Sequence, residues 1–222
     1  MADLTGEPLL SHPHSRAVVV APHPDDEVLA LGGTLAGLAQ RGHAICIYAV
    51  TDGEGSHPQS HCWSPRRLRA ARPLETALAL RRLGITGSVR RLGLPDGGVA
   101  GHEQQLAQQL VLRPEDTVFV TWRHDGHADH EACARAALDA AAAAGARCIE
   151  FPVWALVPGH PAQARLGEHR LRRLALPRAL RLAKFHAIAA FQSQWQADGP
   201  RPPVLPEIAL RSWRRDAEWV LA

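Results

Sequence analysis

Two short segments of the chain concentrate residues that bind metals or transfer protons. The first is residues 22–27, with the sequence PHPDDE, and the second is residues 124–130, with the sequence HDGHADH. A catalytic zinc takes three ligands from His, Asp or Glu side chains and keeps one position for water. Such a set would be formed by His23, Asp26 and His130. The sequence therefore predicts a metal site with these three ligands.

The other polar residues of the two segments fit the acid–base work of amide hydrolysis. Asp25 lies beside the predicted ligands and could take a proton from the attacking water. His127 could donate a hydrogen bond to the developing oxyanion or protonate the leaving amine. Asp129 could orient one of the ligand histidines. Because a metal lowers the pKa of bound water from about 15.7 to about 7, no serine or cysteine nucleophile is required.

Buried strands are expected immediately before both segments. Residues 17–21 (AVVVA) and 117–122 (TVFVTW) are short apolar runs rich in β-branched residues. Helices are expected after the two segments, at residues 27–41 and 128–144. Further strands are predicted at residues 44–51, 89–94 and 146–151. This alternation predicts an α/β fold of three Rossmann-like layers, with a mostly parallel sheet and helices on both faces.

The first and fourth strands are predicted to be neighbours. In doubly wound sheets the strand order reverses at such a pair, and ligands bind outside the carboxyl ends of the strands there. The two reactive segments would then meet, although they lie far apart in the sequence.

The rest of the chain is predicted with less regular patterns. A helix is expected at residues 65–84, with a kink or break at Pro73 because proline lacks an N–H group. The later predictions are a helix at 103–112, a loop at 152–164, an edge strand at 169–176, a helix at 177–191, coil after Pro200 and a strand at 218–221. We expect a loose leader at residues 1–16 and a single domain over residues 17–222.

Composition limits the class of protein and its partners. The chain has 222 residues and a net charge of +3, too close to balance to indicate nucleic acid. No apolar stretch approaches 18 residues, so no membrane span is expected. A secretory signal is not recognisable, and the four scattered cysteines are typical of reduced, mostly buried thiols, so a cytoplasmic location is expected. The predicted partner is a small molecule, with a homo-oligomer left open.

The two reactive segments resemble the signatures of PIG-L / LmbE-like deacetylases. The first signature corresponds to APHPDDEVLALGGTLA, and the second, H-P-D-H, corresponds to HADH with alanine in place of proline. Weaker similarities are RPLE at residues 72–75, LPDGG at 94–98 and KFHAIAAFQSQ at 184–194. The resemblance implies a zinc-dependent hydrolase that removes an N-acetyl or other N-acyl group from an amino-sugar-containing small molecule or conjugate.

The resemblance also implies roles for individual residues. It matches His23, Asp26 and His130 to the metal ligands, Asp25 to the general base and His127 to the oxyanion-stabilising residue or acid. It places Arg72 and Asp96 where members of the family contact substrate. We expect the loops at 52–64, 95–102 and 152–165 to select the substrate.

Two other functions stay open at this point. Two histidines and one carboxylate also match the facial triad of Fe(II) oxygenases, so Fe2+ is the alternative metal. A non-catalytic Rossmann-like module that binds a sugar or nucleotide is the alternative to an enzyme.

Two further groups of residues have open roles. The first is a possible second metal site at His57, His61 and Cys62, although a substrate lid or rim without metal is the favoured interpretation. The second is the basic segment 170–184, which could meet phosphate, nucleic acid or membrane. A solvated face is favoured for its cations, Arg170, Arg172, Arg173, Arg178, Arg181 and Lys184.

Overall fold

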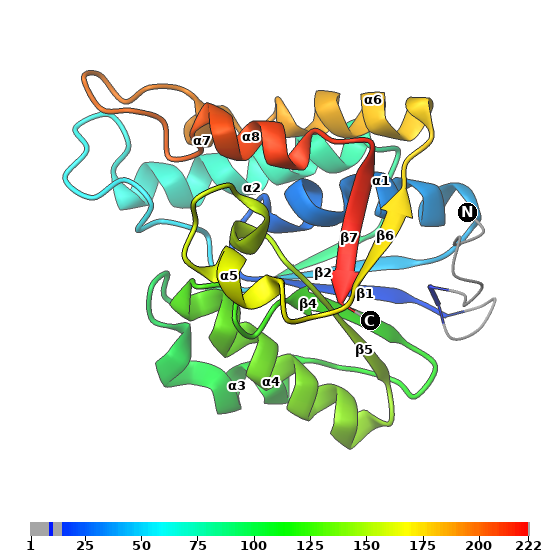
Figure 1. Cartoon of the computed structure of the whole chain (residues 1–222). Coiled ribbons are helices and arrows are strands. Elements are labelled where there is room, and N and C mark those ends of the chain that lie inside the picture. The colour runs from blue at the N-terminus through cyan, green and yellow to red at the C-terminus, as the bar shows by residue number, and fades with distance from the viewer. Residues whose placement is uncertain (1–8, 11–14, 222) are drawn as a thin grey trace.

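The computed structural model describes residues 9, 10 and 15–221 and shows a sheet between two layers of helices (Figure 1). The sheet has the strand order β3-β2-β1-β4-β5. Its strands are Ala17–Ala21 (β1), Ile45–Ala49 (β2), Ser88–Arg91 (β3), Thr117–Thr121 (β4) and Arg147–Phe151 (β5). Every pairing within this sheet is parallel. The predicted three-layer Rossmann-like fold is confirmed.

The predicted neighbourhood of the first and fourth strands is also confirmed. β1 pairs with β4, and Val18 lies opposite Val118. The chain first runs outward from β1 to β2 and β3, and then returns to place β4 on the other side of β1. The carboxyl ends of β1 and β4 therefore meet at one edge, where strand order reverses.

Both faces of the sheet are buried at its three central strands, β1, β2 and β4, which explains why these strands are mostly apolar, whereas the edge strand β3 is exposed. Val18 and Val20 of β1 face a core shared with α3 (Glu103–Gln109) and α4 (Ala128–Ala144). Val19 faces a second core shared with α1 (Asp26–Gln40) and α6 (Arg178–Ile188). The alternation of strand side chains thus fixes one helix layer on each face.

Of the kink or break predicted at Pro73, the break is wrong, because helix α2 (Pro65–Arg82) continues through this residue. Proline removes the N–H group that would bond to the carbonyl four residues earlier. That carbonyl belongs to Arg69, and it instead accepts a hydrogen bond from Arg91 Nη2 at 3.3 Å. A side chain from the neighbouring strand β3 therefore satisfies the group that the proline leaves free.

The C-terminal third differs most from expectation. It contains α5 (Ala162–Leu166), β6 (Leu171–Ala175), α7 (Gln192–Trp195), α8 (Glu207–Trp213) and β7 (Ala217–Leu221). Two short 3-10 helices, η1 (Val99–His102) and η2 (Trp154–Leu156), come earlier in the chain. The predicted edge strand β6 pairs antiparallel with β7 in a separate two-stranded sheet. The region after Pro200 was expected to be coil, but it contains α8. This short helix is stabilised by the burial of Ala209, Leu210 and Trp213.

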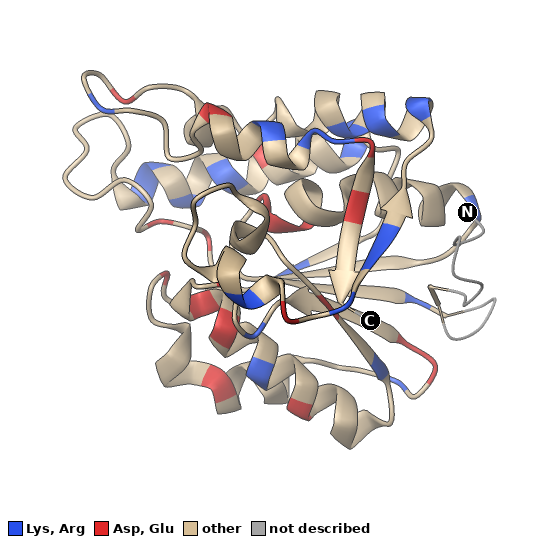
Figure 2. Ribbon diagram, in the orientation of Figure 1, with Lys and Arg blue, Asp and Glu red and all other residues tan. Residues whose placement is uncertain are grey.

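The basic segment 170–184 is not uniformly solvated. Lys184 is 1% exposed and pairs with Glu218 at 2.8 Å, and Arg172 is also buried. The two carboxylate oxygens of Glu218 accept hydrogen bonds from the N–H groups of Gly33 and Thr34, each at 2.8 Å. The solvated-face interpretation is therefore wrong for Lys184 and Arg172. Basic positions are distributed over α2, α4, α6, α8 and β6 (Figure 2).

The N-terminal residues, the cysteines and the length of the helices bear on three further predictions. Of the predicted leader at residues 1–16, positions 1–8 and 11–14 lie outside the described residues, whereas Leu10 is buried in the core and Arg16 pairs with Asp116. All four cysteines are free thiols, two of them buried, one partly buried and Cys62 exposed. Among the described helices, none is long and apolar enough to cross a membrane.

Candidate active site

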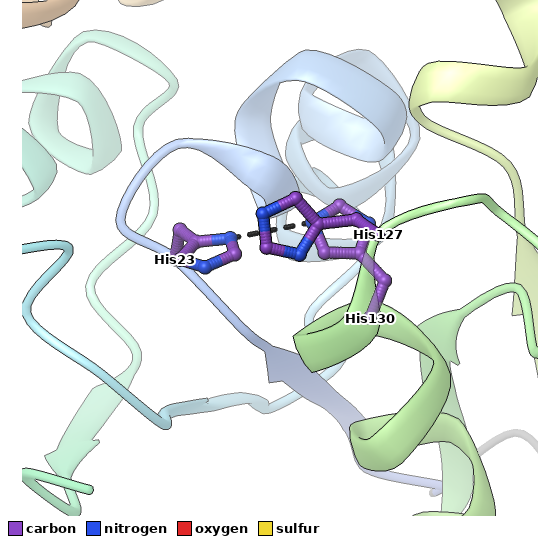
Figure 3. A group of neighbouring side chains, drawn as sticks. All are labelled: His23, His127 and His130. Atoms are coloured by element: carbon purple, nitrogen blue, oxygen red, sulfur yellow. Dashed lines mark hydrogen bonds between the residues drawn. The ribbon is translucent and has the colours of Figure 1, made fainter. Parts of the chain in front are cut away.

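The three predicted metal ligands converge on one point at the carboxyl edge of the sheet. His23 and Asp26 come from the turn between β1 and α1, and His130 comes from the first turn of α4. His23 Nδ1, Asp26 Oδ2 and His130 Nε2 are each 3.3 Å from the other two. Figure 3 shows the rings of His23 and His130 facing each other, with His127 beside them.

The spacing of these three atoms fits a tetrahedral metal ion. Zinc–nitrogen and zinc–oxygen bonds of about 2.0–2.1 Å require ligand atoms roughly 3.3 Å apart. A wider set, in which His127 joins His23 and His130, has its ligand atoms within 4.8 Å of one another. The tighter triangle that includes Asp26 is the better match to zinc.

The second nitrogen of His23 is held by two carboxylates. His23 Nε2 lies 3.1 Å from Asp96 Oδ1 and 3.3 Å from Asp129 Oδ2. Asp129 also accepts hydrogen bonds from the N–H groups of Gly97 and Val99. With a proton on Nε2, the Nδ1 atom of His23 is left with its lone pair directed at the candidate metal site.

Asp125 holds the other ligand histidine in the same way. Asp125 Oδ2 lies 2.8 Å from His130 Nδ1, and the carboxylate also accepts N–H hydrogen bonds from Val153, Trp154 and Ala155. Burial opposes protonation of His130, but Asp26 and Asp125 outweigh it and raise the pKa of His130 to about 9. The same two carboxylates would stabilise a divalent cation at this place.

Asp25 occupies a backbone conformation that residues with a side chain rarely adopt. Its φ is 133° and its ψ is −29°, a conformation that costs about 1–3 kcal/mol and persists only where the surrounding structure imposes it. Glu27 accepts a hydrogen bond from the Asp25 N–H, and Arg72 Nη2 lies 3.3 Å from Asp25 Oδ2. Burial raises the pKa of Asp25 to about 7, against the opposing charge of Arg72. A carboxyl group of this pKa can both accept and return a proton near neutral pH.

Arg72 is buried beneath the cavity that borders the ligands. Besides contacting Asp25, its guanidinium donates to the carbonyls of Pro24 at 2.7 Å and Gly53 at 3.0 Å. Position 53 has a φ of 64°, and a Cβ atom there would lie 1.7 Å from Arg72 Nη1. Glycine is therefore required for this approach. Arg72 lines the cavity, but most of its donors are bound to protein groups.

Asp96 lies at the opening between the ligands and the 52–64 loop. It contacts His23 and accepts the Gly55 N–H at 2.7 Å. Burial would raise its pKa, but the His23 contact outweighs burial and lowers the pKa of Asp96 to about 2. The side chain is therefore an anion that faces the cavity.

His127 is positioned as a neutral hydrogen-bond donor. Its Nδ1 accepts the N–H of Asp129 at 3.3 Å, so the proton of the neutral ring lies on Nε2. Burial, together with the neighbouring His130 and His23, lowers the pKa of His127 to about 4. The ring centroid is 4.7 Å from that of His23 and 4.8 Å from that of His130.

A cavity of about 290 Å³ lies over these groups. The three loops expected to select substrate all contribute to it, through Gly55, Ser56, Asp96, Gly97, Val153 and Trp154. The C-terminal third also contributes, through Gln194, Val204 and Leu205. The indole of Trp154 forms part of the cavity wall.

The family model described as GlcNAc-PI de-N-acetylase, PIG-L, matches residues 18–141, which contain all three candidate ligands. The chain belongs to the PIG-L family. This confirms the predicted resemblance.

Two relatives to which this PIG-L chain is similar are named as deacetylases. It is similar to the 2'-N-acetylparomamine deacetylase of Streptomyces fradiae, with 27% identity over 52% of this chain and 48% of the relative. It is also similar to the 1D-myo-inositol 2-acetamido-2-deoxy-alpha-D-glucopyranoside deacetylase of Streptomyces avermitilis, with 33% identity over 58% of this chain and 53% of the relative. The chain thus spans about half the length of these relatives.

The whole PIG-L fold of this chain also has a solved counterpart. The conserved protein TT1542 from Thermus thermophilus superposes with a TM-score of 0.68 and 26% identity. The superposition covers 94% of both chains, including the C-terminal third that the family model does not match.

The possible second metal site does not form in the described part of this PIG-L chain. There, the groups of potential metal ligands all include His23. His57 is buried and its Nδ1 lies 2.9 Å from Ser56 Oγ, whereas His61 and Cys62 are exposed. Gly55 and Ser56 of this loop line the main cavity.

Sequence reasoning gave no role to Asp125 or to the cavity residues of the C-terminal third. Asp125 stands inside the second reactive segment, so its position could have marked it as a partner for His130. Gln194 ends the segment KFHAIAAFQSQ, which resembles the family, whereas Val204 and Leu205 have no such signal, because their approach to the site depends on the packing of the loop that follows α7.

Proposed function

We propose that the protein is a zinc-dependent amide hydrolase that removes the N-acetyl group of an amino-sugar-containing small molecule or glycoconjugate. The observation that supports this most strongly is the triangle of His23, Asp26 and His130 atoms at 3.3 Å, with Asp25 beside it in a cavity. Membership of the PIG-L family and the deacetylase relatives support the same chemistry.

In this proposal, His23, Asp26 and His130 hold the zinc ion. When bound, the ion would supply a water of lowered pKa and polarise the amide carbonyl. Asp129 and Asp125 keep the two imidazoles oriented through their second nitrogens. Fe2+ suits the same donor set and is the alternative, which metal analysis of the purified protein separates from zinc.

The chain's own residues carry the proton transfers. Asp25 takes a proton from water as the hydroxide oxygen forms a bond to the carbonyl carbon. His127 Nε2–H donates a hydrogen bond to the carbonyl oxygen as its negative charge grows, an interaction worth roughly 3–4 kcal/mol. Asp25 then returns the proton to the nitrogen as the C–N bond breaks. The products are acetate and a free amine.

Neutral His127 favours the oxyanion-donor role over the acid role. A ring whose pKa is about 4 holds one proton at neutral pH, and that proton lies on Nε2. Asp96 and Arg72 line the cavity and stay predicted substrate contacts.

The test is acetate release from a panel of N-acetylated amino sugars, followed by NMR with zinc-loaded protein. We expect release that a chelator abolishes and that His130→Ala eliminates. A fully active His130→Ala protein would contradict the proposal. Tight sugar binding without any product, at stoichiometric zinc, would support a non-catalytic binding module instead, and oxygen-dependent turnover with iron would support a facial-triad oxygenase.

A further inference from the structure

Asp25 precedes helix α1 as its N-cap residue but does not use its side chain to cap the helix. Aspartate is favoured at such positions because its carboxylate normally accepts a hydrogen bond from the first turn. Here the carboxylate accepts no such bond, and the residue has a φ of 133° in place of the usual extended conformation. Its carbonyl accepts the first helical hydrogen bonds, from Val28 and Leu29. The carboxylate is therefore left to the cavity, whose wall it forms together with the predicted ligands His23 and Asp26.

Glu27, in the first turn of α1, provides the acceptor for the backbone N–H of Asp25. Glu27 is completely buried, and its Oε2 accepts this hydrogen bond at 3.2 Å. Within residues 9, 10 and 15–221, Glu27 Oε1 has no hydrogen-bond partner. A buried carboxyl group with a free oxygen is unfavourable for folding, so an apolar side chain would suit this position better if packing were its only purpose. What an apolar side chain would lack is the acceptor for the Asp25 N–H.

The peptide group between Pro24 and Asp25 is thereby bound at both of its polar atoms. Its oxygen, on Pro24, accepts a hydrogen bond from Arg72 Nη2 at 2.7 Å, and its N–H, on Asp25, donates to Glu27. Because a peptide group is planar, these two bonds together set its orientation. The φ of Asp25 is the rotation between this group and the Asp25 Cα atom, so the two bonds impose the rare value of 133°. Without the Glu27 bond, φ would be free to relax, and the direction of the Asp25 carboxylate would change with it.

We propose that Glu27 is a positioning residue, which holds the Asp25 carboxylate in the direction needed for proton transfer by binding the backbone N–H of Asp25. The inference rests on the proposed function, because Asp25 is the base of that reaction. A displacement of about 1 Å at a reacting group can lower a rate by about 100-fold. The three predicted zinc ligands are other side chains, so Glu27 should affect turnover far more than zinc affinity.

The experiment compares Glu27→Gln with Glu27→Met in zinc-loaded protein, using an N-acetylated amino sugar that wild type deacetylates. Both changes remove the carboxylate and keep the length of the side chain, but glutamine alone keeps an acceptor oxygen for the Asp25 N–H. We expect Glu27→Met to lower kcat by about 10- to 100-fold, with KM and zinc affinity within about threefold of wild type. Glu27→Gln should keep kcat within about threefold of wild type. The control is Glu103→Met, which removes a glutamate from the first turn of α3, where it pairs with Arg135 at the surface, and should leave kcat unchanged.

A second comparison tests whether Glu27 acts through Asp25. In an Asp25→Asn background, Glu27→Met should cause no further loss of kcat, because the base is already absent. Losses that multiply would overturn the proposal. Equal losses of kcat in Glu27→Gln and Glu27→Met would also overturn it, because the charge and not the acceptor would then matter. A fall in zinc affinity in parallel with kcat would assign Glu27 to the metal site instead.

Two further outcomes are covered by another variant and by structure determination. If Glu27→Met does not fold, Glu27→Asp keeps the charge but shortens the side chain, and it should show the same loss of kcat; full activity would overturn the proposal. If wild type releases no acetate from any substrate, the proposed function fails, and crystal structures then test the positioning alone. The φ of Asp25 should stay near 133° in Glu27→Gln and depart from it in Glu27→Met or Glu27→Asp. An unchanged φ in the latter variants would overturn the proposal.

Discussion

His130 Nδ1 lies 2.8 Å from Asp125 Oδ2, and both side chains are completely buried. Asp125 is itself fixed by three backbone N–H groups from the segment after β5. The orientation of His130 is therefore set by a part of the chain that contributes no metal ligand.

Asp125→Asn should weaken zinc binding by about 10- to 100-fold, because an amide holds the His130 ring and its tautomer less firmly than a carboxylate does. Competition with a chromophoric chelator measures the affinity. Asp139→Asn on the exposed side of the same helix is the matched control and should bind zinc like wild type. An Asp125→Asn protein with wild-type affinity would show that packing alone orients His130.

Asp25→Asn should lower kcat by about 100-fold or more while leaving zinc content unchanged. An amide cannot take the proton from water, whereas the three ligand atoms belong to other residues. Steady-state kinetics beside metal analysis separates the two effects. A loss of zinc in parallel with activity would mean that Asp25 acts on the metal site and not as the base.

Lys184→Met should lower the free energy of unfolding by roughly 3–5 kcal/mol, because it leaves the buried charge of Glu218 without its cation. The comparison is Arg173→Met, which breaks the exposed pair with Asp216 and should cost less than about 1 kcal/mol. Urea denaturation gives both values. Similar losses in the two variants would show that the Lys184 pair is no more important than a surface contact.

Acidification should destabilise the protein through His57. Burial lowers the pKa of this ring below its ordinary value of 6.5, against the opposing charge of Asp198. The unfolded chain therefore takes up the proton at a higher pH than the folded protein does, so the stability is present above 6.5 and is lost as pH falls toward the folded pKa. The Tm advantage of wild type over His57→Gln should shrink between about pH 8 and about pH 5.5. A constant difference in Tm over this range would contradict the assignment.

The parallel sheet could be predicted because its signals are local. Apolar β-branched runs mark β1 and β4, and each is followed by a helix with clear periodicity. In the C-terminal third, β6, α6 and β7 could also be predicted, but α8 could not, because the burial of this short helix depends on Trp213 packing against distant segments. Likewise, nothing near Pro73 indicates that Arg91 will replace the lost hydrogen bond.

Part of the candidate site could likewise be predicted from the sequence, and part could not. His23, Asp26 and His130 could be identified from residue type and spacing, since both segments are short and dense in ligands. The wall that includes Val204 and Leu205 could not, because it reaches the site only through the packing of loops. What the sequence predicts here is the chemistry, whereas the shape of the cavity depends on long-range contacts.

Glu218 binds the N–H groups of Gly33 and Thr34, which precede it by 185 and 184 residues. During synthesis, a ribosome therefore completes α1 long before it adds the carboxylate that anchors the backbone of this helix. A nascent chain released before Glu218 would carry His23, Asp26 and His130, but the N–H groups of Gly33 and Thr34 would lack their acceptor.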